Sequence, residues 1–255
     1  MDDAALIRLA AELAERAAAI ILAVRERGFE VIAKSDRSPV TEADHAAEAL
    51  IVGGLRSETP DLPVIAEEEV ARGLHTEPAA AYWLVDPLDG TREFAAGRDD
   101  FTVNIGLVRD GMAALGVVGV PAYGEMFAGI PGRGAWKWTR GGEQQPVRVR
   151  PVPPEGITVL ASRHHGGDPR LQTFLRGYKV ATVRHTGSAV KFCRLAEGAG
   201  DLYPRFGRTM EWDTAAPQAV LEAAGGAVRL FGGGRLTYGK PEWENPPFLC
   251  TGGPA

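Results

Sequence analysis

The chain has 255 residues with a formal net charge of −5, and 45% of its residues are hydrophobic while 24% are charged. This composition is typical of a globular protein that can bury a substantial core in one or two domains. The mildly acidic charge argues against binding to a nucleic-acid polymer, because following a phosphate backbone needs a basic surface. It is compatible with small phosphorylated substrates, since a bound metal ion can supply positive charge locally.

The N-terminal region and the cysteines give an expectation for the subcellular location of the protein. The most apolar N-terminal stretch, residues 17–24, is short and follows several acidic residues, so we expect neither a signal peptide nor a transmembrane segment. Two cysteines, Cys193 and Cys250, do not indicate a disulfide framework. A cytoplasmic location is therefore the default expectation.

Two helices are predicted at the start of the chain. Apolar residues recur at steps of three and four over residues 4–27, which predicts an amphipathic helix. Residues 34–40 predict a polar loop. Thr41, with Asp44 three positions later, resembles a capping box that begins a second helix ending near residue 55. Asp44 can therefore be explained as a residue that stabilises this helix N-terminus.

A run of three acidic residues follows the next predicted strand. Residues 64–66 are apolar and predict a short strand, and Glu67, Glu68 and Glu69 come directly after it. Taken alone, such a charged run predicts a solvated loop.

The segment of residues 82–91 is central to the prediction. An apolar strand over 82–85 is followed by a turn that carries Asp86 and Asp89 three positions apart. Pro87 restricts the backbone there, and Gly90 lets the backbone approach a ligand closely. Two carboxylates on a stiff turn, followed by Thr91, suit a hard cation such as Mg²⁺. An ordinary Asp-Pro turn is the simpler alternative.

The next part of the chain predicts an antiparallel meander of about five strands. Apolar and β-branched segments alternate with Gly- and Pro-containing turns. The segments cover residues 101–108, 113–120, 125–128, 135–138 and 147–150. The proline-rich run 151–154 then marks a candidate domain boundary, which predicts domains over residues 1–150 and 151–255.

Beyond the boundary, strand and helix patterns alternate, which predicts an α/β layer. The segments are residues 157–161, 169–175, 179–183, 188–197, 199–203 and a helix over 211–224. Gly187 and Ser188 precede a helix, where free amides could bind an anion, and Lys191 lies one turn further on. A plain N-cap explains Ser188 equally well, and Asp213 near a helix start can be explained by the helix dipole.

Other catalytic patterns are missing from the sequence. The five histidines, His45, His75, His164, His165 and His185, have no zinc-site spacing, and we expect them to be structural or at the surface. The sequence has neither a G-x-S-x-G nucleophile motif nor a Walker phosphate-binding loop.

Several of these segments resemble one family. The sequence D-P-L-D-G-T at 86–91 and W-D-T-A-A at 212–216 are similar to the two signatures of the inositol monophosphatase superfamily of Mg²⁺-dependent, lithium-sensitive phosphatases. T-x-A-D at 41–44 and the acidic pair at 67–68 occur in the family's order, with Ala66 where the family has Gly or Ser. Haloacid dehalogenase-type phosphatases instead have D-x-D-G-T, which is one residue shorter and contains an aspartyl nucleophile.

The resemblance implies a fold and a site. The fold would be an α+β or α/β protein, a layered α-β-α-β-α sandwich with the active site between its halves. Two or three Mg²⁺ ions would be held by Glu67, Asp86, Asp89, Asp213 and the carbonyl of Leu88. Thr91, with Asp44 and Glu68, would orient and deprotonate the attacking water, while Glu69 is the alternative to Glu68. The scissile phosphate would contact Gly90 and Thr91, near Asp213.

Within the superfamily, residues 187–193 and 202–207 resemble the 3′(2′),5′-bisphosphate nucleotidase branch. This implies hydrolysis of the 3′-phosphate of adenosine 3′,5′-bisphosphate, a by-product of sulfate assimilation, and possible action on its sulfated form. Ser188, Lys191 and Arg205 would bind the second phosphate and the ribose. The alternatives are an inositol or sugar monophosphatase, an aspartyl-phosphate enzyme acting through Asp86, and a catalytically silent phosphate- or metal-binding protein. A monomer and a homodimer are both compatible with the sequence.

Overall fold

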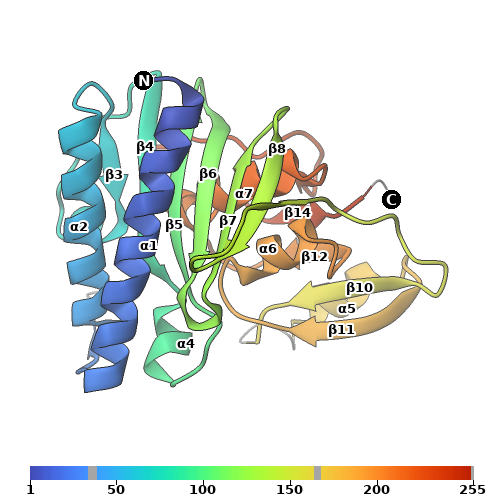
Figure 1. Ribbon diagram of the computed structural model, residues 1–255. Helices are drawn as coiled ribbons and strands as arrows, with labels where there is room; N and C mark the ends of the chain where they lie inside the picture. Colours follow the sequence, from blue (N-terminus) through green and yellow to red (C-terminus); the bar gives the residue numbers. More distant parts are fainter. Residues whose placement is uncertain (34–38, 164–167, 254–255) are drawn as a thin grey trace.

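The computed structural model describes residues 1–33, 39–163 and 168–253 (Figure 1). Most of the loop predicted at 34–40, and His164 and His165, therefore lie outside the described residues. His45, His75 and His185 are exposed, as predicted.

Two long helices, α1 (Asp3–Arg27) and α2 (Glu42–Glu58), form one outer layer. The side chain of Asp2 caps α1 by accepting a hydrogen bond from the Ala5 amide at 2.8 Å. The capping box of α2 is present. The Thr41 side chain accepts a hydrogen bond from a backbone amide of the first turn, and the Asp44 side chain accepts one from the Thr41 amide. Both predicted helices are confirmed, and their apolar faces pack together and onto a sheet.

The sheet beneath these helices has seven strands in the order β3-β4-β5-β6-β7-β8-β9. All neighbours pair antiparallel except β3 and β4, which are parallel. The meander is therefore confirmed. The strands are β3 (Val64–Ala66), β4 (Ala81–Asp89), β5 (Thr102–Arg109), β6 (Met112–Val120), β7 (Glu125–Ile130), β8 (Gly134–Thr139) and β9 (Gln145–Val147).

A second sheet has five strands in the order β11-β10-β12-β14-β13. Parallel pairs join β10 to β11 and β12, and antiparallel pairs join β14 to β12 and β13. The predicted α/β layer is thus confirmed, although the sequence did not indicate the last two strands. The elements are β10 (Ile157–Ala161), α5 (Pro169–Leu175), β11 (Val180–His185), α6 (Val190–Ala196), β12 (Leu202–Arg205), α7 (Ala215–Ala223), β13 (Ala227–Leu230) and β14 (Phe248–Thr251).

Helices α6 and α7 lie between the two sheets (Figure 1). Their core joins Phe127 of the first sheet to Tyr203 and Phe248 of the second. Glycines allow α7 to pack closely, because a Cβ at Gly116 would lie 2.3 Å from the Ala216 carbonyl oxygen. Helix α5 packs on the outer face of the second sheet. The predicted α-β-α-β-α sandwich is confirmed, whereas the division at residue 150 stays a prediction.

Short elements account for the main differences from the sequence prediction. The expected solvated loop after β3 is wrong, because Glu67–Ala71 forms helix α3 and buries Glu68. The expected turn at 86–89 is also wrong in part. Strand β4 continues to Asp89, and its pairing with β5 shifts register between Asp86 and Asp89. The remaining elements are β1 (Ile32–Ala33), β2 (Pro39–Val40), α4 (Thr91–Ala95) and the 3₁₀ turns η1 (Pro121–Tyr123) and η2 (Glu211–Asp213).

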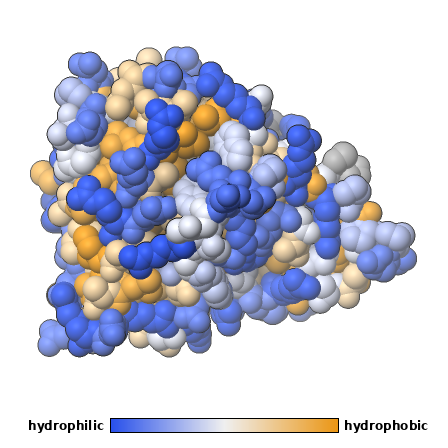
Figure 2. Space-filling view, viewed as in Figure 1, coloured by the Kyte–Doolittle hydropathy of each residue, from blue (hydrophilic) through white to orange (hydrophobic). Residues whose placement is uncertain are grey.

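The surface seen in Figure 2 consists mainly of hydrophilic residues interrupted by small apolar areas. Within the described ranges, none of the helices is both long and apolar enough to cross a membrane.

Candidate active site

The end of strand β4 carries the first two predicted ligands. The register shift between Asp86 and Asp89 is a bulge, which bends a strand and redirects its side chains. Asp86 is buried, and its carboxylate accepts a hydrogen bond from the Leu88 amide at 3.0 Å. Asp89 is partly exposed and accepts one from the Ala189 amide at 2.6 Å. Asp89 therefore connects the first sheet to the start of α6.

Four acids influence one another here, although they come from three parts of the chain. Burial, followed by the charges of Glu67, Asp89 and Asp213, raises the pKa of Asp86 well above its usual value. Burial and the same neighbouring acids also raise the pKa of Asp213, to about 8. The pKa of Asp89 is raised by burial, even though Lys191 and the Ala189 amide oppose the shift. The site thus concentrates negative charge that a cation would stabilise.

The donor set fits a hard divalent cation, which prefers carboxylate and carbonyl oxygens. Buried Asn104 pairs with Asp86 across the sheet, and neither polar atom of its amide has a hydrogen-bond partner among the described residues. No three acidic, histidine or cysteine side chains of the described chain converge closely enough to hold an ion as they stand. The carboxylates of Asp86, Asp89 and Asp213 bind nearby amides instead. Binding an ion would therefore require these side chains to reorient.

Thr91 lies at the start of α4, directly after Gly90, whose φ is 95°. The Thr91 hydroxyl lies 3.0 Å from both a carboxylate oxygen of Asp44 and the carbonyl oxygen of Leu88, so its one proton is shared between them. Asp44 is buried, and its other oxygen accepts from the amide and hydroxyl of Thr41. Asp44 thus caps α2, as the sequence predicts, and also contacts Thr91, whereas its role toward an attacking water stays a prediction.

Helix α3 places the acidic run. Glu68 is 2% exposed, whereas Glu69 forms a two-pronged ion pair with Arg56 at 2.7 and 2.9 Å. Glu67 is partly exposed and lies among the acids described above. The arrangement favours Glu68 over Glu69 as the acid that supports the site.

Lys191 and Arg205 provide positive charge beside the acids. Lys191 is buried, and its Nζ donates to the carbonyl oxygens of Ser188 at 2.7 Å and Thr186 at 3.2 Å, over the ring of Tyr203. Burial, and then the nearby charge of Arg205, lowers the pKa of Lys191 to about 7. The two cations repel each other, so an anion between them would be bound favourably.

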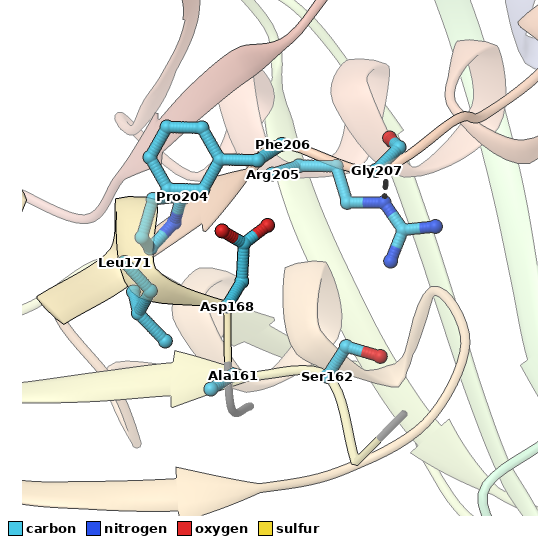
Figure 3. A pocket seen from close by; sticks show the side chains of 8 residues that line it. All are labelled: Ala161, Ser162, Asp168, Leu171, Pro204, Arg205, Phe206 and Gly207. Atoms are coloured by element: carbon cyan, nitrogen blue, oxygen red, sulfur yellow. Dashed lines mark hydrogen bonds between the residues drawn. The ribbon is translucent and has the colours of Figure 1, made fainter. Parts of the chain in front are cut away.

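A small pocket borders Arg205 (Figure 3). It is lined by the ends of β10 and β12 together with the start of α5, including Ser162, Asp168 and Phe206. The Arg205 guanidinium donates hydrogen bonds to the carbonyl oxygens of Gly207 and Arg208, which restrain the side chain.

The predicted ligands thus come from α3, the end of β4 and η2, beside the start of α6. Two residues that sequence reasoning missed also face this region. Asn104 is a single polar residue inside the otherwise apolar and β-branched middle of β5, and Asp100 belongs to a polar run before that strand, so neither is part of a motif. Their importance depends on partners far away in the sequence.

The fold and these segments define the class. The inositol monophosphatase family matches residues 2–247, and the chain belongs to this family. The chain is 42% identical over 243 residues to the 3′(2′),5′-bisphosphate nucleotidase CysQ of Escherichia coli (strain K12), covering 94% of this chain and 97% of that protein. It is 39% identical over 205 residues to the Buchnera aphidicola protein of the same name, covering 80% of this chain and 76% of that protein.

Solved structures agree with this assignment. The crystal structure of CysQ from Bacteroides thetaiotaomicron superposes with a TM-score of 0.82 at 32% identity, and 98% of each chain is covered. An inositol monophosphatase from Anabaena superposes with a TM-score of 0.76 at 27% identity, covering 98% of this chain and 91% of that one.

Proposed function

We propose that the protein is a metal-dependent phosphatase that removes the 3′-phosphate of adenosine 3′,5′-bisphosphate. The observation that carries the proposal is the similarity to CysQ nucleotidases over nearly the whole chain. Lys191 and Arg205 support it, because these two basic side chains lie beside the acids, where a second phosphate would lie. The sulfated form of the nucleotide has the same 3′-phosphate and is a second substrate to test.

The metal is Mg²⁺ in this proposal, with two or three ions held by Glu67, Asp86, Asp89, Asp213 and the carbonyl oxygen of Leu88. Mg²⁺ bound there would act as a Lewis acid that stabilises charge on the phosphoryl oxygens and lowers the pKa of a water molecule. The clustered carboxylates provide negative charge for this purpose, and the raised pKa values of Asp86 and Asp213 follow from burial and from the charges of the neighbouring acids.

The chain's own residues orient the reaction. The Thr91 hydroxyl, held by Asp44, would accept a hydrogen bond from the attacking water and direct it at phosphorus. Asp44, with Glu68, would take a proton from the water as the water oxygen bonds to phosphorus. A proton would pass to the 3′-oxygen of the ribose as its P–O bond breaks, releasing adenosine 5′-phosphate and inorganic phosphate. The amides of Gly90 and Thr91 would hold the scissile phosphate, and the absence of a side chain at Gly90 leaves room for it.

The test of the function is phosphate release by the purified protein with Mg²⁺. Adenosine 3′,5′-bisphosphate is compared with inositol 1-phosphate, with and without lithium. We expect preference for the nucleotide and inhibition by lithium. Preference for inositol 1-phosphate would make the protein a monophosphatase, and a phosphorylated Asp86 would indicate the aspartyl-phosphate mechanism. Magnesium binding without any phosphate release would indicate a binding protein.

Two further measurements address location and assembly. Cell fractionation tests the proposed cytoplasmic location, and light scattering distinguishes a monomer from a homodimer.

Lys191→Ala tests the binding of the second phosphate. We expect KM for adenosine 3′,5′-bisphosphate to rise about tenfold or more, because a charge-assisted contact contributes about 1.5–3 kcal/mol. The KM for adenosine 3′-phosphate, which lacks the second phosphate, should change much less. Steady-state kinetics on both substrates measures the difference. Equal effects on the two would remove Lys191 from this role.

A further inference from the structure

Asp100 lies where four separate segments of the chain meet. It is 4% exposed and sits in the loop between α4 and β5. One carboxylate oxygen accepts a hydrogen bond from the Tyr123 hydroxyl at 3.0 Å. The other accepts from the Gly187 amide at 3.1 Å and from the Arg163 guanidinium, whose Nε lies at 3.2 Å. One side chain of the first half thus holds two segments of the second half.

The segment that Asp100 holds on the second half is the loop 186–189, which leads into α6. Asp100 binds the Gly187 amide and Asp89 binds the Ala189 amide, so carboxylates of the first half fix the loop at two points. The loop is also tightly packed, because a Cβ at Gly187 would lie 2.8 Å from the Asp100 carbonyl oxygen. Between the two fixed points, Ser188 adopts a φ of 43°, a conformation that a non-glycine residue rarely takes unless its surroundings impose it.

This loop determines where the buried ammonium group lies. Lys191 Nζ donates to the carbonyl oxygens of Thr186 and Ser188, which flank the residue held by Asp100. A movement of the loop would therefore move the ammonium group and the Ser188 side chain together. Asp100 also binds Arg163, which directly follows Ser162, a residue that lines the pocket beside Arg205. The contact between Asp100 and Arg163 therefore restrains the chain next to this pocket.

We propose that Asp100 is a positioning residue that sets the affinity for the second phosphate of the substrate. It does so by fixing the loop 186–189, and through the loop Ser188 and Lys191, while it restrains Arg163 at the pocket. The inference rests on the proposed function, in which Lys191 and Arg205 bind the phosphate that is not hydrolysed.

The test is Asp100→Ala in the full-length protein. We expect KM for adenosine 3′,5′-bisphosphate to rise about tenfold or more, with kcat within about twofold, as for the loss of a charged hydrogen-bonding partner. Kinetics on adenosine 3′-phosphate should remain close to wild type. Hydrogen exchange of the peptide covering 186–189 should become faster, because its Gly187 amide loses its acceptor. Asp100→Asn, which keeps an acceptor for that amide, should restore most of the affinity.

Asp201→Ala is the matched control. Asp201 is also buried, and it also accepts from an arginine, Arg150, and from a backbone amide, that of Thr158. It precedes β12, whose opposite end carries Arg205. This variant should lower the melting temperature comparably and leave KM for both substrates unchanged.

The outcomes separate two failures. A wild-type protein without activity on the bisphosphate would overturn the proposed function, and the role of Asp100 with it. If the wild type is active, two results would overturn the role of Asp100 alone. The Asp100→Ala variant could keep the wild-type KM, or its KM could rise equally for both substrates.

Discussion

Asp89→Asn is expected to lower kcat/KM with Mg²⁺ by at least about 1000-fold, which corresponds to about 4 kcal/mol of transition-state stabilisation. The substitution removes one of the charges on which cation binding depends and keeps the size of the side chain. The fold should persist, because the asparagine oxygen can still accept the hydrogen bond from the Ala189 amide. Phosphate release and calorimetric Mg²⁺ titration measure the effect, with circular dichroism as the check on folding.

Asp201→Asn serves as the control for this variant. It removes the charge of another aspartate, one that is buried and paired with Arg150 and that we assign no role in metal binding. Its kcat/KM and Mg²⁺ affinity should stay close to wild type. An Asp89→Asn protein with a near-normal rate would remove Asp89 from the set of metal ligands.

The fold was largely predictable where hydrophobic periodicity is long and regular. Helices α1 and α2 bury one continuous face, and the strands from β5 to β8 alternate with clear turn signals, so local pattern and tertiary packing agree. Strands β13 and β14 were missed. Each is only four residues long. Strand β13 pairs with β14, and β14 pairs with β12, so these pairings join parts of the chain that are far apart in sequence.

The prediction was wrong where tertiary contacts override a local signal. Asp86 and Pro87 form a turn pattern, yet β5 extends the pairing of β4 to Asp89 through a bulge. The acidic run 67–69 has the composition of a solvated loop. This run forms a helix instead. The Glu48 carboxylate accepts a hydrogen bond from the Glu68 amide at 2.7 Å, and Arg56 forms an ion pair with Glu69.

The candidate site divides in the same way. The acids proposed as metal ligands could be named from the sequence because they lie in three short segments, residues 67–68, 86–91 and 212–216, that resemble family motifs. Asp100 and Asn104 could not, since their partners come from other segments. Asp100 and Gly187, for example, are 87 positions apart in the sequence, so no local pattern indicates their contact.

The acidic cluster also makes the stability of the metal-free protein depend on pH. The pKa of Asp213 is raised to about 8 in the folded protein, above the value of about 4 for an unfolded chain. Between these two pKa values the folded state binds more protons than the unfolded state, so stability falls as pH rises through this window. In EDTA, the melting temperature of the wild type should therefore decrease from about pH 5 to about pH 8, and Mg²⁺ should reverse the decrease.

Asp213→Asn is expected to weaken this dependence. The variant lacks a carboxyl that must ionise beside Asp89 and Glu67, so in EDTA near pH 8 it should melt at least about 2–4 °C above wild type, the shift for about 1 kcal/mol. Mg²⁺ should stabilise it much less. Asp201→Asn should keep the wild-type slope, because hydrogen bonds from Arg150 and Thr158 outweigh burial and lower the pKa of Asp201, which therefore titrates below this window. Thermal melts in EDTA and in Mg²⁺ measure both effects. Parallel pH slopes for wild type and Asp213→Asn would show that Asp213 is not part of a repulsive cluster.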